Sequence, residues 1–76
     1  MVVRVTGILS RELFRKDDFS IIAIKPMDID NLLFEQVLTM KTFVVKGRIP
    51  KLNPDDQYIF VGNIEENNQW QTVKLS

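Results

Sequence analysis

The sequence predicts an all-β domain folded as a small barrel. Five short runs are rich in β-branched and aromatic residues, turn-forming residues separate them, and Gly7, Gly47 and Gly62 stand within or at the end of a run. β-Branched and aromatic side chains favour strands, and a glycine inside a strand pattern is typical of a bend or bulge. Short, bent strands with regular turn signals favour a closed barrel over a sandwich.

Each strand is predicted from its own pattern. The first alternates Val3, Val5 and Leu9 on one face with Arg4 and Thr6 on the other. The second ends at a proline, the third is apolar and β-branched, and the last two alternate in the same way as the first. The predicted strands cover residues 2–9, 19–25, 42–49, 57–64 and 69–75, with turns at 16–18 and 65–68 and with Pro26 ending the second strand.

The segment 27–41 allows two interpretations. Its apolar residues recur at spacings of three and four, and Asp28 or Asp30 could cap a helix. We therefore expect a short helix near 29–36 followed by a strand. The alternative is an irregular excursion leading into an extended strand from Val37. With either outcome, five strands in this order favour an OB-like barrel, with an SH3-like barrel as the second choice.

Composition limits the chemistry. Seventy-six residues form a single domain, and the absence of cysteine and histidine removes disulfides, thiolate metal sites and the usual general base. The adjacent acids at 17–18, 55–56 and 65–66 fit turns better than a catalytic pair. No apolar run reaches the roughly 18 residues that span a bilayer. We therefore expect a cytoplasmic domain with no catalytic residues, no cofactor and no metal.

Positive charge is concentrated locally although the net charge is zero. The stretch 41–51 carries four cations and no acid, and further arginines flank Glu12. Cations on one side of a small barrel can contact phosphates, and the alternative is that these are ordinary solvated strand faces and loops. The candidate nucleic-acid-binding residues are Arg11, Arg15, Lys41, Lys46, Arg48 and Lys51.

Aromatic residues bear on the same question, because barrels that bind single strands stack bases on exposed aromatic rings. A domain this small also needs large side chains in its core. We therefore expect Phe19, Phe43 and Phe60 to fill the barrel. Tyr58 and Trp70 stand among polar neighbours and are expected to be partly exposed, with packing the favoured role for Trp70.

The order of these features resembles the N-terminal OB-like domain of RecD-like DNA helicases, relatives of the exodeoxyribonuclease V alpha subunit. The resemblance covers nearly the whole chain, although 26–41 is longer than the usual connection and the tryptophan comes later than usual. The segments that carry it are Gly7-Ile8-Leu9, Phe14, Phe19-Ser20-Ile21-Ile22-Ala23-Ile24, Val45-Lys46-Gly47-Arg48-Ile49-Pro50, Tyr58 to Gly62 and, more loosely, Trp70.

This resemblance implies an accessory domain, the N-terminal fragment of a larger ATP-dependent DNA helicase. The ATPase motifs of that family are absent from these 76 residues, so the fragment itself would catalyse nothing. Its partners would be single-stranded or junction DNA, contacted weakly and without sequence specificity, and the downstream helicase domains of the parent chain. The alternative is a protein-interaction barrel with no nucleic-acid role, which the zero net charge favours.

Overall fold

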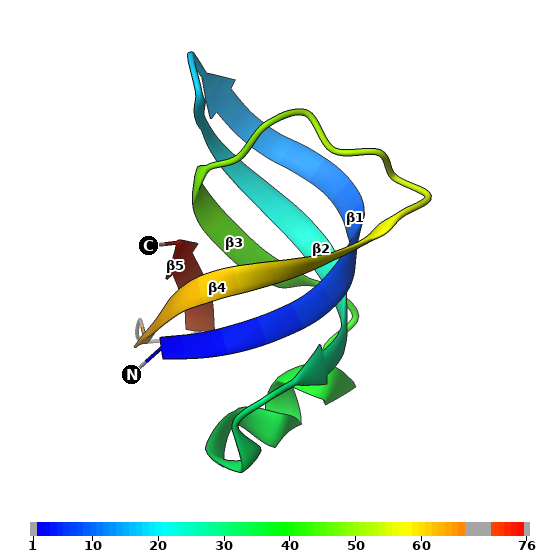
Figure 1. Ribbon diagram of the computed structural model, residues 1–76, viewed down its shortest axis with the longest axis vertical. Coiled ribbons are helices and arrows are strands. Elements are labelled where there is room, and N and C mark those ends of the chain that lie inside the picture. The colour runs from blue at the N-terminus through cyan, green and yellow to red at the C-terminus, as the bar shows by residue number, and fades with distance from the viewer. Residues whose placement is uncertain (1, 67–70, 76) are drawn as a thin grey trace.

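A computed structural model describes residues 2–66 and 71–75 of the chain, and this part forms a five-stranded barrel with one short 3-10 helix (Figure 1). The elements are β1 (Val2–Lys16), β2 (Phe19–Ile29), η1 (Leu32–Thr39), β3 (Phe43–Arg48), β4 (Gln57–Glu66) and β5 (Gln71–Leu75). No helix in the described ranges is long and apolar enough to cross a membrane.

The strand order confirms the predicted OB-like barrel. The sheet closes in the order β1-β2-β3-β5-β4, with β4 returning to β1. The pairing of β3 with β5 is parallel, and the other neighbouring pairs are antiparallel. All five predicted strands are present, although the predicted residues 69 and 70, including Trp70, lie outside the described residues. The predicted turn at 65–68 is wrong in its first half, because Glu65 and Glu66 belong to β4.

β1 is the longest strand and takes part in two sides of the barrel. Its first half pairs with β4, and almost its whole length pairs with β2. Pairing with β2 skips Ser10 and Leu13 in β1, so each of these residues is a bulge. Bulges bend a strand and increase its twist, which lets one strand curve around the barrel. The predicted end of the first strand at residue 9 was wrong, because β1 stays paired with β2 through the polar residues that follow and accommodates them with these bulges.

β2 also runs beyond its predicted end at Pro26. The register between β1 and β2 shifts beside this residue, because Thr6 pairs with Asp28 while Gly7 pairs with Pro26, leaving Met27 as the extra residue. A proline is tolerated at a bulge, where its missing N–H need not interrupt the ladder. The predicted bend at Gly7 is confirmed by the same shift, and a Cβ there would lie 2.8 Å from the carbonyl oxygen of Lys25.

The helix η1 starts later than the predicted 29–36 and is a 3-10 helix. Its cap is Asn31, whose Oδ1 accepts a 2.9 Å hydrogen bond from the N–H of Leu33, so neither predicted aspartate caps it. Val37 is the buried residue of this helix, and Leu32 and Leu33 are exposed. Figure 1 shows η1 at one end of the barrel, after β2 and before β3.

The core fills the barrel with alternate residues of every strand. Phe43 and Phe60 are buried in it, as predicted, and Tyr58 packs against it while partly exposed. Phe19 was predicted in the core and is instead 39% exposed, because its partner Arg48 faces solvent on the outside of the barrel. The buried apolar residues are Val3, Val5, Ile22, Ala23, Ile24, Ile29, Val37, Phe43, Val45, Ile49, Phe60 and Val73.

Two glycines let β5 fit between β3 and β4. At Gly62, a Cβ would lie 2.1 Å from the carbonyl oxygen of Lys74. At Gly47, φ is +147° and a Cβ would lie 2.9 Å from the Cβ of Leu75. A side chain at either position would push β5 away, so glycine is needed for the barrel to close here.

Candidate nucleic-acid interface

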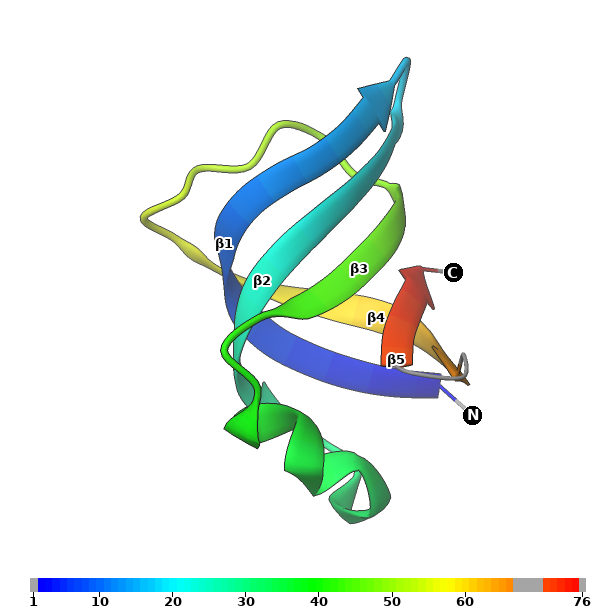
Figure 2. The ribbon, with the colours of Figure 1, turned by 180° about the vertical axis from the view of Figure 1, so that it is seen from behind.

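The outside of the barrel over β1, β2 and β3 is the candidate site (Figure 2). Along β2, the side chains of Ser20, Ile22 and Ile24 are buried, so the intervening Phe19 and Ile21 point outward. Partners across neighbouring strands share a face, which fixes the outward residues of β1 and β3 as well. We call this surface the basic face; its residues are Arg11, Leu13, Phe14, Lys16, Phe19, Ile21, Lys41, Val44, Lys46, Arg48 and Lys74.

Four of the six predicted residues lie on the basic face. Arg11 stands opposite Ala23 and lines, with Lys41, a broad hollow of about 740 Å³. Lys46 and Arg48 alternate outward along β3 and line a second hollow of about 450 Å³. The two hollows lie along β3, one lined by Val44 and the residues before it and the other by Lys46 and the residues after it. The cations therefore line a continuous side of the sheet.

Exposed aromatic rings lie between these cations. Phe14 is 48% exposed and Phe19 is 39% exposed, and their ring centroids are 6.3 Å apart in an edge-to-face arrangement. The two rings flank the β1–β2 turn, where Asp17 adopts a positive φ of 56°. Phe19 also lines the second hollow beside Lys46 and Arg48. A ring next to cations is the arrangement that holds a base and its phosphate together.

Two of these cations already have carboxylate neighbours. Lys46 Nζ lies 3.3 Å from Glu65 Oε2, and Arg48 Nε lies 3.6 Å from Asp18 Oδ2. The side chains of Arg48 and Asp18 are 86% and 70% exposed, and exposed pairs of this kind contribute at most about 1 kcal/mol. A phosphate can therefore replace Asp18 beside Arg48 at little cost.

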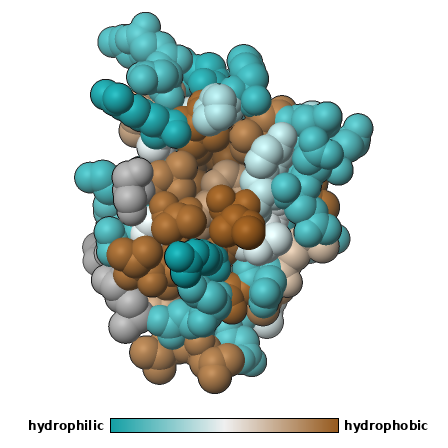
Figure 3. Space-filling model, in the orientation of Figure 1, coloured by the Kyte–Doolittle hydropathy of each residue, from teal (hydrophilic) through white to brown (hydrophobic). Residues whose placement is uncertain are grey.

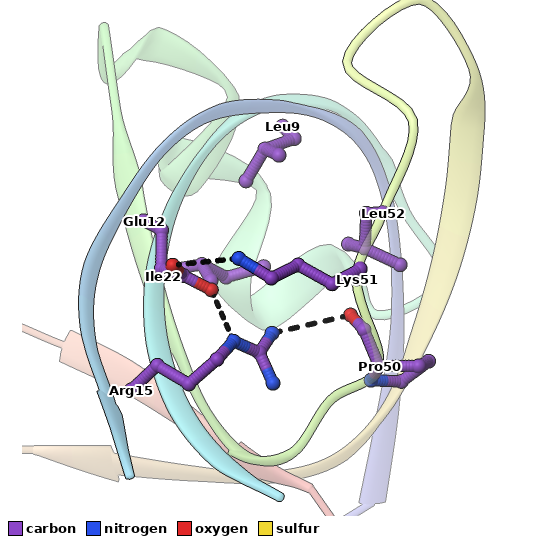
Figure 4. Close-up of a pocket in the computed structure, with 7 residues that line it drawn as sticks. All are labelled: Leu9, Glu12, Arg15, Ile22, Pro50, Lys51 and Leu52. Atoms are coloured by element: carbon purple, nitrogen blue, oxygen red, sulfur yellow. Dashed lines mark hydrogen bonds and ion pairs between the residues drawn. The ribbon is translucent and has the colours of Figure 1, made fainter. Parts of the chain in front are cut away.

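The other two predicted residues, Arg15 and Lys51, lie elsewhere. Both converge on Glu12 in a small pocket of about 150 Å³ at the end of the barrel (Figure 4). The guanidinium of Arg15 donates to Glu12 and also to the carbonyl of Pro50, at 3.3 Å, and Lys51 Nζ lies 3.5 Å from Glu12 Oε2. The pair with Arg15 is the main cause that holds the pKa of Glu12 below its usual range. This cluster fastens the β3–β4 connection to β1 and does not add to the basic face.

Sequence reasoning missed four residues of the basic face. Lys16 and Lys74 extend the positive charge, since they stand opposite Phe19 and Lys46. Phe14 and Phe19 supply the exposed rings: Phe19 was expected in the core, and Phe14 was given no role in binding. The pairing of Phe14 and Phe19 had a usable signal, because both flank a predicted tight turn and so belong to one hairpin.

Residues 2–66 and 71–75 hold no group of three or more histidine, cysteine, aspartate or glutamate side chains that could bind a metal ion. Comparison with known proteins finds no family model, no curated protein and no solved structure that matches the chain. The resemblance to RecD-like helicases therefore stays a prediction.

Proposed function

We propose that the domain makes weak, sequence-independent contacts with single-stranded nucleic acid, DNA in the setting that the resemblance implies. The observation that carries this proposal is the pair of exposed rings, Phe14 and Phe19, on the side of the barrel that also holds Arg11, Lys46 and Arg48. The face over β2 and β3 is also where OB barrels bind oligonucleotides. Bases would stack on the rings while the cations contact phosphates, which gives affinity without sequence readout.

The expected affinity is low. Few phosphates can be neutralised at once, and the chain has no net positive charge to attract a polyanion from a distance. We expect a Kd in the non-specific range of roughly 10⁻⁴–10⁻⁶ M at physiological salt. If the four predicted cations of the basic face each contact a phosphate, the logarithm of the association constant should fall with log salt with a slope of about −3.

Fluorescence anisotropy of a labelled oligothymidylate in 20 mM and 200 mM salt tests the proposal. Binding in low salt that weakens with the expected slope supports it. The proposal is contradicted if no binding is detected in low salt, or if the affinity does not change with the salt concentration. Duplex DNA of the same length is the matched control, because paired bases cannot stack on Phe14 or Phe19.

The parent protein is a separate part of the proposal. If the chain is an accessory domain of an ATP-dependent helicase, deleting it from the parent should reduce unwinding while leaving ATP hydrolysis by the motor domains intact. The second candidate function, a protein-interaction barrel, is favoured by the zero net charge and by an apolar slot on another side of the barrel.

A further inference from the structure

The two exposed rings of the basic face belong to neighbouring rows of side chains that cross β1, β2 and β3 (Figure 2). In one row, Phe19 stands between Lys16 of β1 and Arg48 of β3. In the next row on the same face, Phe14 of β1 is followed across the sheet by β2 and then by Lys46 of β3. Each row therefore offers one ring for a base and, on β3, one cation for a phosphate.

The fold of the hairpin holds the two rings at an angle to each other. Phe14 and Phe19 are diagonal neighbours in the β1–β2 ladder, with ring centroids 6.3 Å apart and ring planes inclined by 64°. The bulge at Leu13 increases the twist of β1 beside the first ring. The buried hydroxyl of Ser20 donates a 3.0 Å hydrogen bond to the carbonyl of Phe14, which fixes the backbone that carries this ring.

A continuously stacked strand does not match this arrangement. Successive bases in a stack are parallel and rise by about 3.4 Å from one to the next. The two rows are two residues apart along the strands, which is about 6.7 Å. Bases lying flat on Phe14 and Phe19 would also be inclined to each other, because the ring planes are 64° apart. A strand that uses both rings therefore has to be extended, with its stack broken between two neighbouring nucleotides.

The other ring pair of the described residues does not offer two platforms. Tyr58 and Phe60 have centroids 6.4 Å apart and planes inclined by 50°, but Phe60 is only 5% exposed and cannot receive a base. The hydroxyl of Tyr58 accepts a 2.9 Å hydrogen bond from the backbone N–H of Asn53. Figure 3 shows the side of the molecule that β4 crosses, where hydrophobic side chains gather in the middle. The ring pair on the basic face is thus the one that can hold two bases.

We infer that the basic face selects extended strands without continuous base stacking, so that thymine tracts bind in preference to adenine tracts. This preference rests on the proposed function and narrows its class of ligand. Neighbouring thymines stack weakly, whereas neighbouring adenines stack into a helical single strand that must be broken before both rings can be covered. The selectivity comes from stacking strength and backbone flexibility, with no hydrogen-bond readout of the bases.

The test compares oligothymidylate with oligoadenylate of the same length, about 12 nucleotides, which is within the range of OB-fold sites. Fluorescence anisotropy in low salt gives the two affinities. We expect oligothymidylate to bind about threefold tighter or more, because it can cover both rings while an adenine stack reaches one. Independent stacking of single bases would give the opposite order, because a purine has the larger face.

Removing one ring should remove the selectivity. Phe14→Ala leaves Phe19 as a single platform, which the end of an adenine stack can also cover, so the ratio of the two affinities should fall to about one or reverse. Lys16→Gln is the matched control, because it removes a cation beside Phe19 and leaves both rings in place. It should weaken both oligonucleotides by the same factor, and circular dichroism checks the fold of each variant.

Three results would overturn the inference. Equal binding of the two oligonucleotides, or tighter binding of oligoadenylate, would show that strand stacking does not matter, while the proposed nucleic-acid contact would stand. A preference that Phe14→Ala leaves unchanged would show that the ring pair is not its source. Absence of binding for both oligonucleotides in low salt would remove the proposed function and the inference together.

Discussion

The cations of the basic face and those around Glu12 come from the same stretches of sequence but have different surroundings. Arg11 and Arg48 face solvent on the outside of the sheet, and Arg48 lines its hollow together with the exposed ring of Phe19. Arg15, four residues after the first, and Lys51, three residues after the second, both pair with Glu12 at the end of the barrel. A cation beside an open ring is available to a phosphate, whereas one that holds a loop in place is committed to the fold. Local charge density in the sequence therefore overestimates the binding surface.

The largest effect should come from reversing charge on the basic face. We expect the triple variant Lys41→Glu, Lys46→Glu, Arg48→Glu to lose oligonucleotide binding altogether, since three attractive contacts become three repulsive ones. The fold should persist, because all three side chains lie on the outside of the barrel. Anisotropy measures the binding, and circular dichroism checks the fold.

The matched control is the pair Arg15→Gln and Lys51→Gln around Glu12. It removes two positive charges without touching the basic face, and we expect the Kd for the oligonucleotide to change by less than about twofold. Loss of binding in this control comparable to that of the triple variant would mean that the two sets of cations act alike. The distinction between the two regions would then be wrong.

The next effect concerns stacking. Phe14→Ala or Phe19→Ala should each weaken binding by roughly 5- to 150-fold, because one base–ring contact contributes about 1–3 kcal/mol. The slope of the logarithm of the association constant against log salt should stay unchanged, since no phosphate contact is lost. The check is anisotropy with both a normal and an abasic oligonucleotide. If the alanine variants bind the normal oligonucleotide as well as the unmodified chain does, the rings have no stacking role.

A further effect is expected on the stability of the fold that carries the basic face, with oligonucleotide binding affected only indirectly. Gly47 lies between Lys46 and Arg48 with φ of +147°, and a Cβ there would meet Leu75. Gly47→Val should lower the free energy of unfolding by about 1–3 kcal/mol. Chemical denaturation measures this, and Arg48→Val, a change at the neighbouring exposed position, is the control. An unchanged midpoint for Gly47→Val would remove the structural role of this glycine.

The strands and the barrel could be predicted because alternation and turn residues are local signals. The sequence could not predict which cations share a face of the sheet, and Arg11 and Arg15 show why. In a regular strand, residues four apart point to the same side. The bulge at Leu13 adds one residue between them and puts them on opposite faces. A bulge is set by pairing with β2, so nothing in the sequence of β1 alone reveals it.

The extension of β1 beyond residue 9 has a similar cause. The polar sequence after residue 9 does not predict a strand. The bent backbone of β1 nevertheless has a hydrogen-bond partner there, because the buried hydroxyl of Ser20 donates a 3.0 Å hydrogen bond to the carbonyl of Phe14. Phe19 was expected in the core because large side chains usually fill small barrels. Its place in β2 puts it outside instead, because it precedes the inward-facing Ser20 and pairs with the solvent-facing Arg48.

The smallest effect should come from Glu12 itself and should depend on pH. Its pKa in the folded chain lies below the ordinary value of about 4.5, chiefly because Arg15 donates to the carboxylate. A lowered pKa in the folded state means that ionised Glu12 stabilises the fold above its ordinary pKa, and that this contribution is lost as pH falls through the lower folded value. The melting temperature of the chain should therefore fall more steeply below pH 4.5 than that of Glu12→Gln, and the two curves should converge in acid. Oligonucleotide binding at neutral pH should be the same for both, because Glu12 does not lie on the basic face. Parallel melting curves from pH 7 to pH 3, measured by circular dichroism, would show that Glu12 does not fasten the β3–β4 connection, and the contrast between the two regions would rest on the basic face alone.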